Sequence, residues 1–225
     1  MTDPESFKKM PLFPLNTVLF PGMVLPLHIF EPRYRLMIGR CIQQQQPFGV
    51  VLIREGQEVG GPADPHDIGT TAYITHSERQ PDGRINIHTV GYQRFRIHKM
   101  EQTEPYLIGI VEDFPVQGEQ DERVPDLVQT LKPALKRYLS GLIDAAGMEV
   151  DLEEIPDDGL ALAYFVAIAL PLPMDEKQKI LAAPNLAKML SLEFGMIRRE
   201  LALLGDMIRR DETVNEQPDM LFSTN

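Results

Sequence analysis

The 225-residue sequence contains no tryptophan and a single cysteine, Cys41. One cysteine cannot form an internal disulfide, and no cysteine pair is available for a zinc site. The longest apolar run, residues 160–170, is far shorter than the ~20 residues that a membrane-spanning helix needs. The first nine residues also lack the apolar segment of a secretory signal. We therefore expect a cytoplasmic protein of bacterial type that has no membrane contact.

Positive charge is scarce as well, because 22 Lys and Arg stand against 33 Asp and Glu, a net charge of -11. The imbalance lies in the second half. Residues 1–115 carry 11 basic and 13 acidic side chains, whereas residues 116–225 carry 11 and 20. Nucleic-acid binding depends on clustered Lys and Arg that neutralise phosphates, so this distribution argues against a nucleic-acid partner.

The motifs of catalysis are missing too. There is no G-x-x-x-x-G-K-[ST] loop to hold a nucleotide, and none of the five serines lies in a G-x-S-x-G turn. Ser140 follows Lys136 by one helical turn, but an exposed serine and a solvated lysine explain this pair without a catalytic dyad. The five histidines are scattered and offer no metal cage. We expect no enzymatic activity, no cofactor and no dependence on ATP.

What is present is an opening stretch rich in proline. Four prolines between residues 11 and 26 exclude a helix and leave two short apolar strands, residues 10–15 and 24–29. Pro32 fits the first turn of a helix, and Tyr34, Met37, Ile38 and Cys41 then recur at helical spacing. Two strands leading into a helix are therefore predicted.

A compact apolar run predicts a further strand at 48–54. Short strands with turns between them are predicted at 70–78, 84–90, 93–101 and 107–114, with a bend at Gly91-Tyr92. Residues 55–67 are rich in Gly and Pro and predict a mobile loop. From residue 124 onward the apolar period is helical, with Pro133 expected to kink the first helix. The pattern indicates an α+β protein in which a barrel precedes a helical bundle.

Four segments carry a resemblance to a known family. They are P-L-F-P-L-N-T-V-L-F-P-G (residues 11–22), L-x-I-F-E-P-R-Y-R-x-M (residues 27–37), and the pair of strand segments at 90–97 and 106–112. This order resembles the amino-terminal, substrate-binding domain of Lon proteases, and more closely its stand-alone bacterial relatives that lack the ATPase and protease domains. The similarity extends to about Leu204.

The resemblance implies a PUA-like β-barrel (residues 8–115), an α-helical bundle (122–210) and a flexible tail (211–225). It also implies a non-catalytic module that binds unfolded or extended polypeptide segments of damaged proteins in proteolysis or quality control. A separate protease or chaperone is then an expected partner. A small-molecule receptor that uses the barrel mouth and the 55–67 loop remains the alternative.

Aromatic and basic residues near the barrel rim are the candidate substrate contacts. The same aromatic residues also fit core positions, and the arginines also fit ion pairs with the acidic second domain, so both roles stay open. The candidates are Phe13, Phe20, Phe30, Arg33, Arg35, Tyr92, Arg94 and Arg96.

Overall fold

Residues 8–44 form two strands followed by a helix, as the proline pattern predicts. β1 (Lys8–Leu15) and β2 (Val24–Ile29) precede α1 (Pro32–Gln44). Glu31 is the N-cap residue of α1 and Pro32 its first residue, where the missing N–H costs no intrahelical hydrogen bond. The predicted apolar stripe of α1 is buried, from Tyr34 to Cys41.

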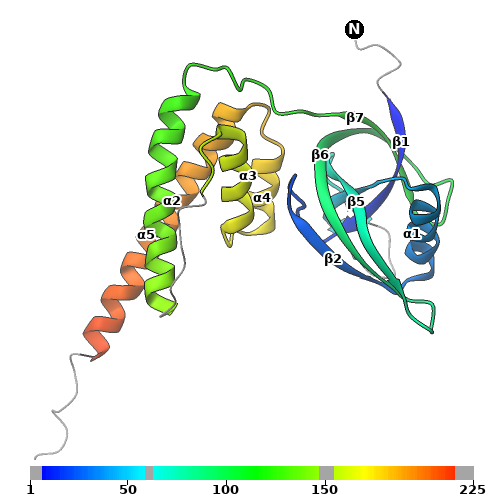
Figure 1. Ribbon diagram of the computed structural model, residues 1–225, viewed down its shortest axis with the longest axis horizontal. Helices are drawn as coiled ribbons and strands as arrows, with labels where there is room; N and C mark the ends of the chain where they lie inside the picture. The colour runs from blue at the N-terminus through cyan, green and yellow to red at the C-terminus, as the bar shows by residue number, and fades with distance from the viewer. Residues whose placement is uncertain (1–6, 59–62, 147–154, 216–225) are drawn as a thin grey trace, which may run out of the picture. The chain divides into compact units, whose positions relative to one another are not determined.

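The computed structural model describes residues 7–58, 63–146 and 155–215 (Figure 1). It divides into two compact units. The barrel unit comprises residues 1–117 and 167–185, and the helical unit comprises residues 118–166 and 186–225. The predicted boundaries, 8–115 and 122–210, instead assign residues 167–185 to the second domain.

Seven strands build the sheet of the barrel unit. After β1 and β2 come β3 (Phe48–Gly56), β4 (Ala63–Pro65), β5 (Ile68–Arg79), β6 (Ile85–Glu101) and β7 (Leu107–Asp113). The pairing order β1-β7-β6-β5-β3 returns to β1 through a parallel β1–β3 pair, so these five strands close a ring. β2 pairs with the first part of β6, and β4 pairs with the end of β3. The predicted α+β class and barrel are confirmed, although the ring is unevenly closed.

Two predictions for this sheet need correction. Residues 55–67 are not one irregular loop, because β3 continues to Gly56 and Ala63–Pro65 pairs with it as β4. Residues 59–62 of that segment lie outside the described part of the chain. The two strands predicted on either side of Gly91-Tyr92 form one long strand, β6, whose pairing register with β5 shifts at that point. The bend is thus a bulge within a strand.

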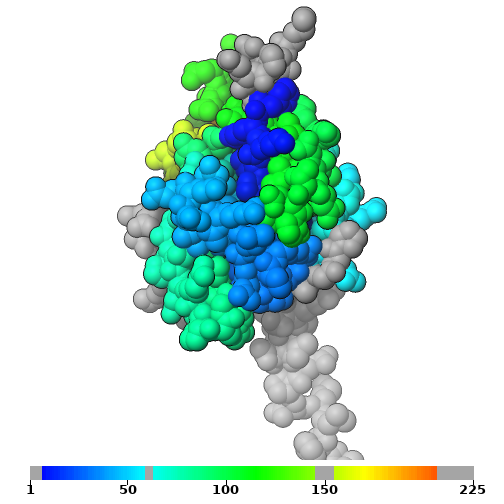
Figure 2. All heavy atoms as spheres, turned by 90° about the vertical axis from the view of Figure 1, so that its right-hand side faces the viewer, coloured from blue at the N-terminus to red at the C-terminus, as the bar shows by residue number. Residues whose placement is uncertain are grey.

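The apolar core of the barrel unit lies on both faces of the strands. One cluster packs α1 against one face of β1, β2, β3, β5 and β6, and includes Met37, Phe48 and Ile87. A second cluster contains Leu12 and Phe95 and lies on the opposite face of β1. Figure 2 shows α1 (mid-blue) between the start of β1 (dark blue) and the β5–β6 hairpin (blue-green). The guanidinium of Arg35 lies against Gly83 in the turn of that hairpin.

A short helix far along the chain also belongs to the barrel unit. α4 (Met174–Leu181) follows α3 (Gly159–Ala169), and the Gln178 side chain donates to the Ile68 carbonyl of β5 at 2.9 Å. Arg94 of β6 donates to the carbonyls of Leu181 and Ala183 at 2.6 and 2.7 Å. These hydrogen bonds fix the end of α4 to the sheet.

In the helical unit, α2 (Val124–Ala146) and α5 (Leu186–Asn215) pack side by side (Figure 1). Gly159 lies close to both Val124 and Leu186, at the start of each helix, and Gly141 lies close to Leu204. The two helices therefore run in the same direction. α2 continues through Pro133 without a break. None of the described helices combines the length and apolarity that a membrane span requires.

Candidate functional site

The layer formed by β2, β6 and β5 has one face on the core and one face exposed. Leu25, Leu27 and Ile29 of β2 contribute to the cluster beneath α1, so the alternate residues of β2 point the other way. Val90 of β6 pairs with Val24 of β2 on one side and with Tyr73 of β5 on the other. Residues on neighbouring strands thus gather on the exposed face.

We name Val24, Tyr73, Val90 and Tyr92 the sheet face. Val24 is 59% exposed and Tyr92 is 62% exposed. The rings of Tyr73 and Tyr92 meet edge to face, with 5.4 Å between their centroids. Large apolar side chains that gather on an ordered surface mark a binding site more often than isolated ones do. Tyrosine suits such a site because the ring supplies apolar area and the hydroxyl can hydrogen-bond to a partner.

Histidines continue this exposed face toward the far end of β2. The rings of His76 and His88 lie 5.9 Å apart on paired strands, and His28 Nδ1 is 2.6 Å from the Asn86 side-chain oxygen. The ring of Phe30, which is exposed, stacks near His28. Within the described residues, no three His, Cys, Asp or Glu side chains lie together in a way that could hold a metal ion.

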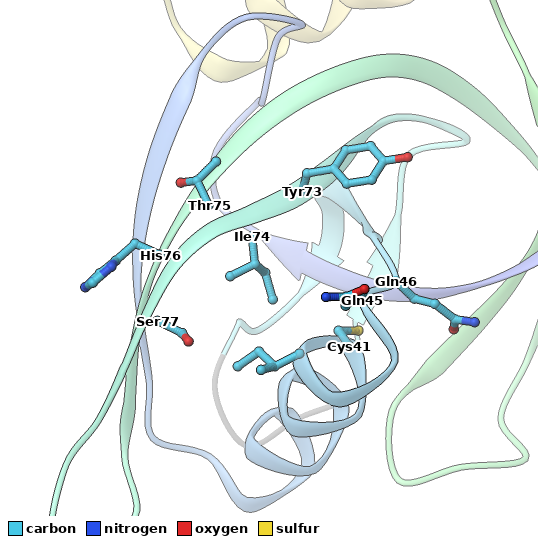
Figure 3. Close-up of a pocket in the computed structure, with 9 residues that line it drawn as sticks. Cys41, Gln45, Gln46, Tyr73, Ile74, Thr75, His76 and Ser77 are labelled. Atoms are coloured by element: carbon cyan, nitrogen blue, oxygen red, sulfur yellow. The ribbon is translucent and has the colours of Figure 1, made fainter.

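Two hollows border the same layer. One, of about 380 Å³, lies between the end of α1 and residues 73–77 of β5 (Figure 3). The other, of about 140 Å³, brings together Phe13 and Phe30 beside Tyr34 and Glu58. Two of the predicted contact residues therefore line a common cavity.

Three of the predicted contact residues, Phe13, Phe20 and Arg94, lie in the core, which is the other role that the sequence left open for the two phenylalanines. Phe20 is fully buried, and Phe13 stacks on Tyr34 with 4.1 Å between ring centroids. Arg94 is 2% exposed and also donates to the Phe114 carbonyl at 3.1 Å. Of the three, Phe13 alone still reaches a cavity wall.

The other arginines have partners inside the barrel unit. Arg33 pairs with Glu31 at 3.0 Å and lies over the Tyr34 ring. Arg96 pairs with Glu112 at 3.5 Å. Arg35, as described above, contacts the β5–β6 turn. Arg33 and Arg96 thus have charged partners within the barrel unit, and Arg35 lines a hollow of about 340 Å³ beside the turn.

Sequence reasoning missed Val24 and Tyr73 of the sheet face. The signal for Val24 was the alternation of side chains along β2. Because Leu25 and Leu27 face the core, Val24 must lie on the outer face. Tyr73 had no comparable signal, because the register of β5 against β6 shifts on both sides of it.

One protein family matches most of the chain. The sequence model of the ATP-dependent protease La (LON) substrate-binding domain matches residues 9–199. Among similar proteins, the Lon protease of Anaeromyxobacter dehalogenans is 28% identical over 200 residues, which are 87% of this chain and 24% of that protein. Lon protease 2 of Syntrophobacter fumaroxidans is 29% identical over 186 residues, 81% of this chain and 23% of that protein. The chain spans about a quarter of the length of these relatives.

Solved structures share the fold. A Lon N-terminal domain protein from Xanthomonas campestris superposes with a TM-score of 0.63 at 25% identity, covering 82% of this chain and 95% of that one. The N-terminal domain of a Mycobacterium avium complex Lon protease superposes with a TM-score of 0.64 at 19% identity, covering 85% and 98%.

Proposed function

Because the chain belongs to the family of ATP-dependent protease La (LON) substrate-binding domains, we propose that its sheet face holds exposed apolar segments of unfolded or damaged polypeptides. The observation that carries this proposal is the exposure of Val24 and Tyr92 on ordered strands. Unfolded chains expose apolar side chains that folded proteins bury. An apolar surface of this kind therefore binds unfolded chains in preference to folded proteins.

The proposed role is binding without chemistry. Burial raises the pKa of the Cys41 thiol to about 11, so this side chain is not a thiolate nucleophile at neutral pH. The matched family is a substrate-binding domain. We propose that the chain acts without ATP or a cofactor in the cytoplasm, and that it passes the bound segment to a separate protease or chaperone.

The test is binding of a permanently unfolded probe, reduced and carboxymethylated α-lactalbumin, measured by fluorescence anisotropy. We expect Tyr92→Ser to weaken binding about tenfold, because an aromatic contact at the centre of an interface is worth ~1–2 kcal/mol or more. Met100→Ser is the matched control, since Met100 is an exposed apolar residue of the same strand outside the sheet face.

Native, calcium-bound α-lactalbumin should not bind. Equal binding of the folded and unfolded forms would contradict the proposal. So would an equal loss of affinity in the Tyr92 and Met100 variants.

The alternative function is a small-molecule receptor at the cavity shared by Phe13 and Phe30. In its favour, aromatic rings and the Glu58 carboxylate converge there. The volume of about 140 Å³ is well below the ~300–1,000 Å³ of typical ligand sites. A thermal-shift screen of metabolites and nucleotides tests it. A metabolite that stabilises the protein, together with no binding of the unfolded probe, would replace the favoured proposal.

A further inference from the structure

One edge of β5 is only partly paired. On one side β6 pairs with β5 along its whole length, from Ile68 to Arg79. On the other side β3 pairs only with Thr70, Thr71 and Ala72. In the described part of the chain, no strand pairs with residues 73–79 on that side.

The hydrogen bonds of the neighbouring strands show which backbone groups of β5 point to this open edge. Gly91 donates its N–H to the Met23 carbonyl at 2.9 Å, on the side of β2. Because hydrogen-bonding direction alternates along a strand, residues 85, 87 and 89 of β6 also face β2, and residues 86, 88 and 90 face β5. The β5 residues opposite these three therefore direct their own N–H and C=O groups toward β6.

Those β5 residues are Tyr73, His76 and Glu78. A register shift between Ile74 and His76 marks a bulge at Thr75. Ile74 and Ser77 therefore direct their N–H and C=O groups away from β6, toward the open edge. No backbone hydrogen bond from either residue to the α1 side is present among the described residues.

The hollow of about 380 Å³ runs along this edge. Its opposite wall is the end of α1, at Cys41 and Ile42, with Gln45 and Gln46 directly after the helix. Figure 3 shows Ile74 pointing into the hollow toward Cys41 and Ser77 turned toward the helix, whereas Tyr73, Thr75 and His76 point away. The hollow thus has an apolar floor and a hydrogen-bonding strand edge as one wall.

We propose that an extended segment of the bound polypeptide adds to the edge of β5 as a further strand, with hydrogen bonds at Ile74 and Ser77. A strand edge presents backbone donors and acceptors together, and another extended backbone satisfies both whatever its side chains are. One apolar side chain of the segment fills the hollow against Ile42 and Ile74. This tolerance of sequence is what a receptor for diverse unfolded chains requires.

The open edge is continuous with the sheet face, because Tyr73 lies next to Ile74 and contacts Tyr92. A segment held along the edge places its remaining side chains beside the sheet face. Charged side chains at Glu78 and Arg79 follow directly and oppose pairing beyond the hollow, since charges at an edge discourage strand addition. This inference rests on the proposed function and gives it a mode of binding.

The test compares two substitutions at one exposed position. Ser77→Pro removes the outward N–H and leaves the pairing with β6, because proline is tolerated where the N–H of an edge residue faces solvent. Ser77→Ala removes the hydroxyl and keeps the N–H. We expect the proline variant to bind reduced, carboxymethylated α-lactalbumin about tenfold more weakly than the alanine variant, because a backbone acceptor on the probe loses its donor.

Amide hydrogen exchange of the unmodified protein provides the second readout, which does not depend on the folding of a variant. On saturation with the unfolded probe, the amides of Ile74 and Ser77 should exchange at least about tenfold more slowly. The amide of Met100, outside the edge, should not change.

Probe binding with unchanged exchange at Ile74 and Ser77, or equal affinities of the two Ser77 variants, overturns strand addition and leaves the proposed function intact. No binding by the unmodified protein overturns both.

Discussion

At the scale of single residues, burial rather than residue type decides what each polar group does. Arg94 and Tyr92 are two residues apart on β6, yet the first is 2% exposed and the second 62%. Thr70 is opposite Arg94, and Ala72 is opposite Gly91. Thr70 and Ala72 lie on the same face of β5. Their partners Arg94 and Gly91 therefore lie on one face of β6, and the bulge between them places Tyr92 on the other face.

Glu193 is the most unusual single residue of the helical unit. Its side chain is fully buried in α5, and both carboxylate oxygens lack a hydrogen-bond partner among the described residues. Burial raises the pKa of this carboxyl well above its usual value. The protonated form is therefore favoured in the folded protein.

We predict that Glu193→Gln stabilises the protein as the pH rises. The unfolded chain loses the Glu193 proton near the ordinary pKa, whereas the folded chain keeps it to higher pH, so wild-type stability falls across the interval between the two pKa values. Glutamine does not titrate. Its advantage should be small near pH 4 and about 1–3 kcal/mol at pH 8, because at pH 8 the wild-type chain must take up a proton or bury a charge when it folds.

Urea unfolding at both pH values measures this difference. The exposed carboxylate Glu122, changed to Gln, is the control and should alter stability little at either pH. A Glu193→Gln variant whose advantage is the same at pH 4 and pH 8 would show that the carboxyl is not protonated by burial.

At the scale of elements, a distant segment completes the barrel unit. α4 begins 73 residues after the end of β6, yet the Arg94 guanidinium donates to the carbonyls of Leu181 and Ala183 as well as to that of Phe114. Packing of Arg94 over the Phe114 ring adds a cation–π contact. α4 is therefore tied to the sheet by one buried side chain together with Gln178.

We predict that Arg94→Met lowers the free energy of unfolding by about 3 kcal/mol or more, since it leaves two buried carbonyls and one part-buried carbonyl without this donor. Arg96→Met is the matched control. The side chain of Arg96 is 43% exposed and pairs with Glu112 at 3.5 Å, so its loss should cost ~0–1 kcal/mol. Urea midpoints of the two variants compare them directly, and similar midpoints would contradict the buried role of Arg94.

At the scale of the whole molecule, the excess of negative charge and the sheet face lie in different halves of the sequence. Acidic residues predominate in residues 116–225, whereas the sheet face is uncharged and lies in the nearly neutral first half. Binding through Val24, Tyr73 and Tyr92 should therefore depend on apolar contact rather than on attraction between charges.

We predict that the affinity for reduced, carboxymethylated α-lactalbumin changes less than about twofold between low and moderate salt, because salt screens exposed charges and leaves apolar contacts in place. Anisotropy titrations at a series of NaCl concentrations measure this. A steep decrease in affinity with salt would instead assign the binding to the half-buried arginines Arg33, Arg35 and Arg96.

The sequence alone determined the elements whose cause is local. Proline at residues 11, 14, 21 and 26 excludes a helix whatever surrounds it, and the spacing from Tyr34 to Cys41 defines the buried stripe of α1 before any partner is known. The order of motifs was sufficient to indicate the family, which the match over residues 9–199 confirms.

Only the tertiary structure decided which residues the surface presents. Strand alternation separates two faces, but whether a face is covered depends on segments far away, and one bulge exchanges the faces for every residue beyond it. For this reason Arg94 became a core residue held by α4 and Tyr73 became exposed beside Tyr92. The open edge of β5 likewise exists because β3 begins at Phe48 opposite Ala72, a register that neither strand encodes by itself.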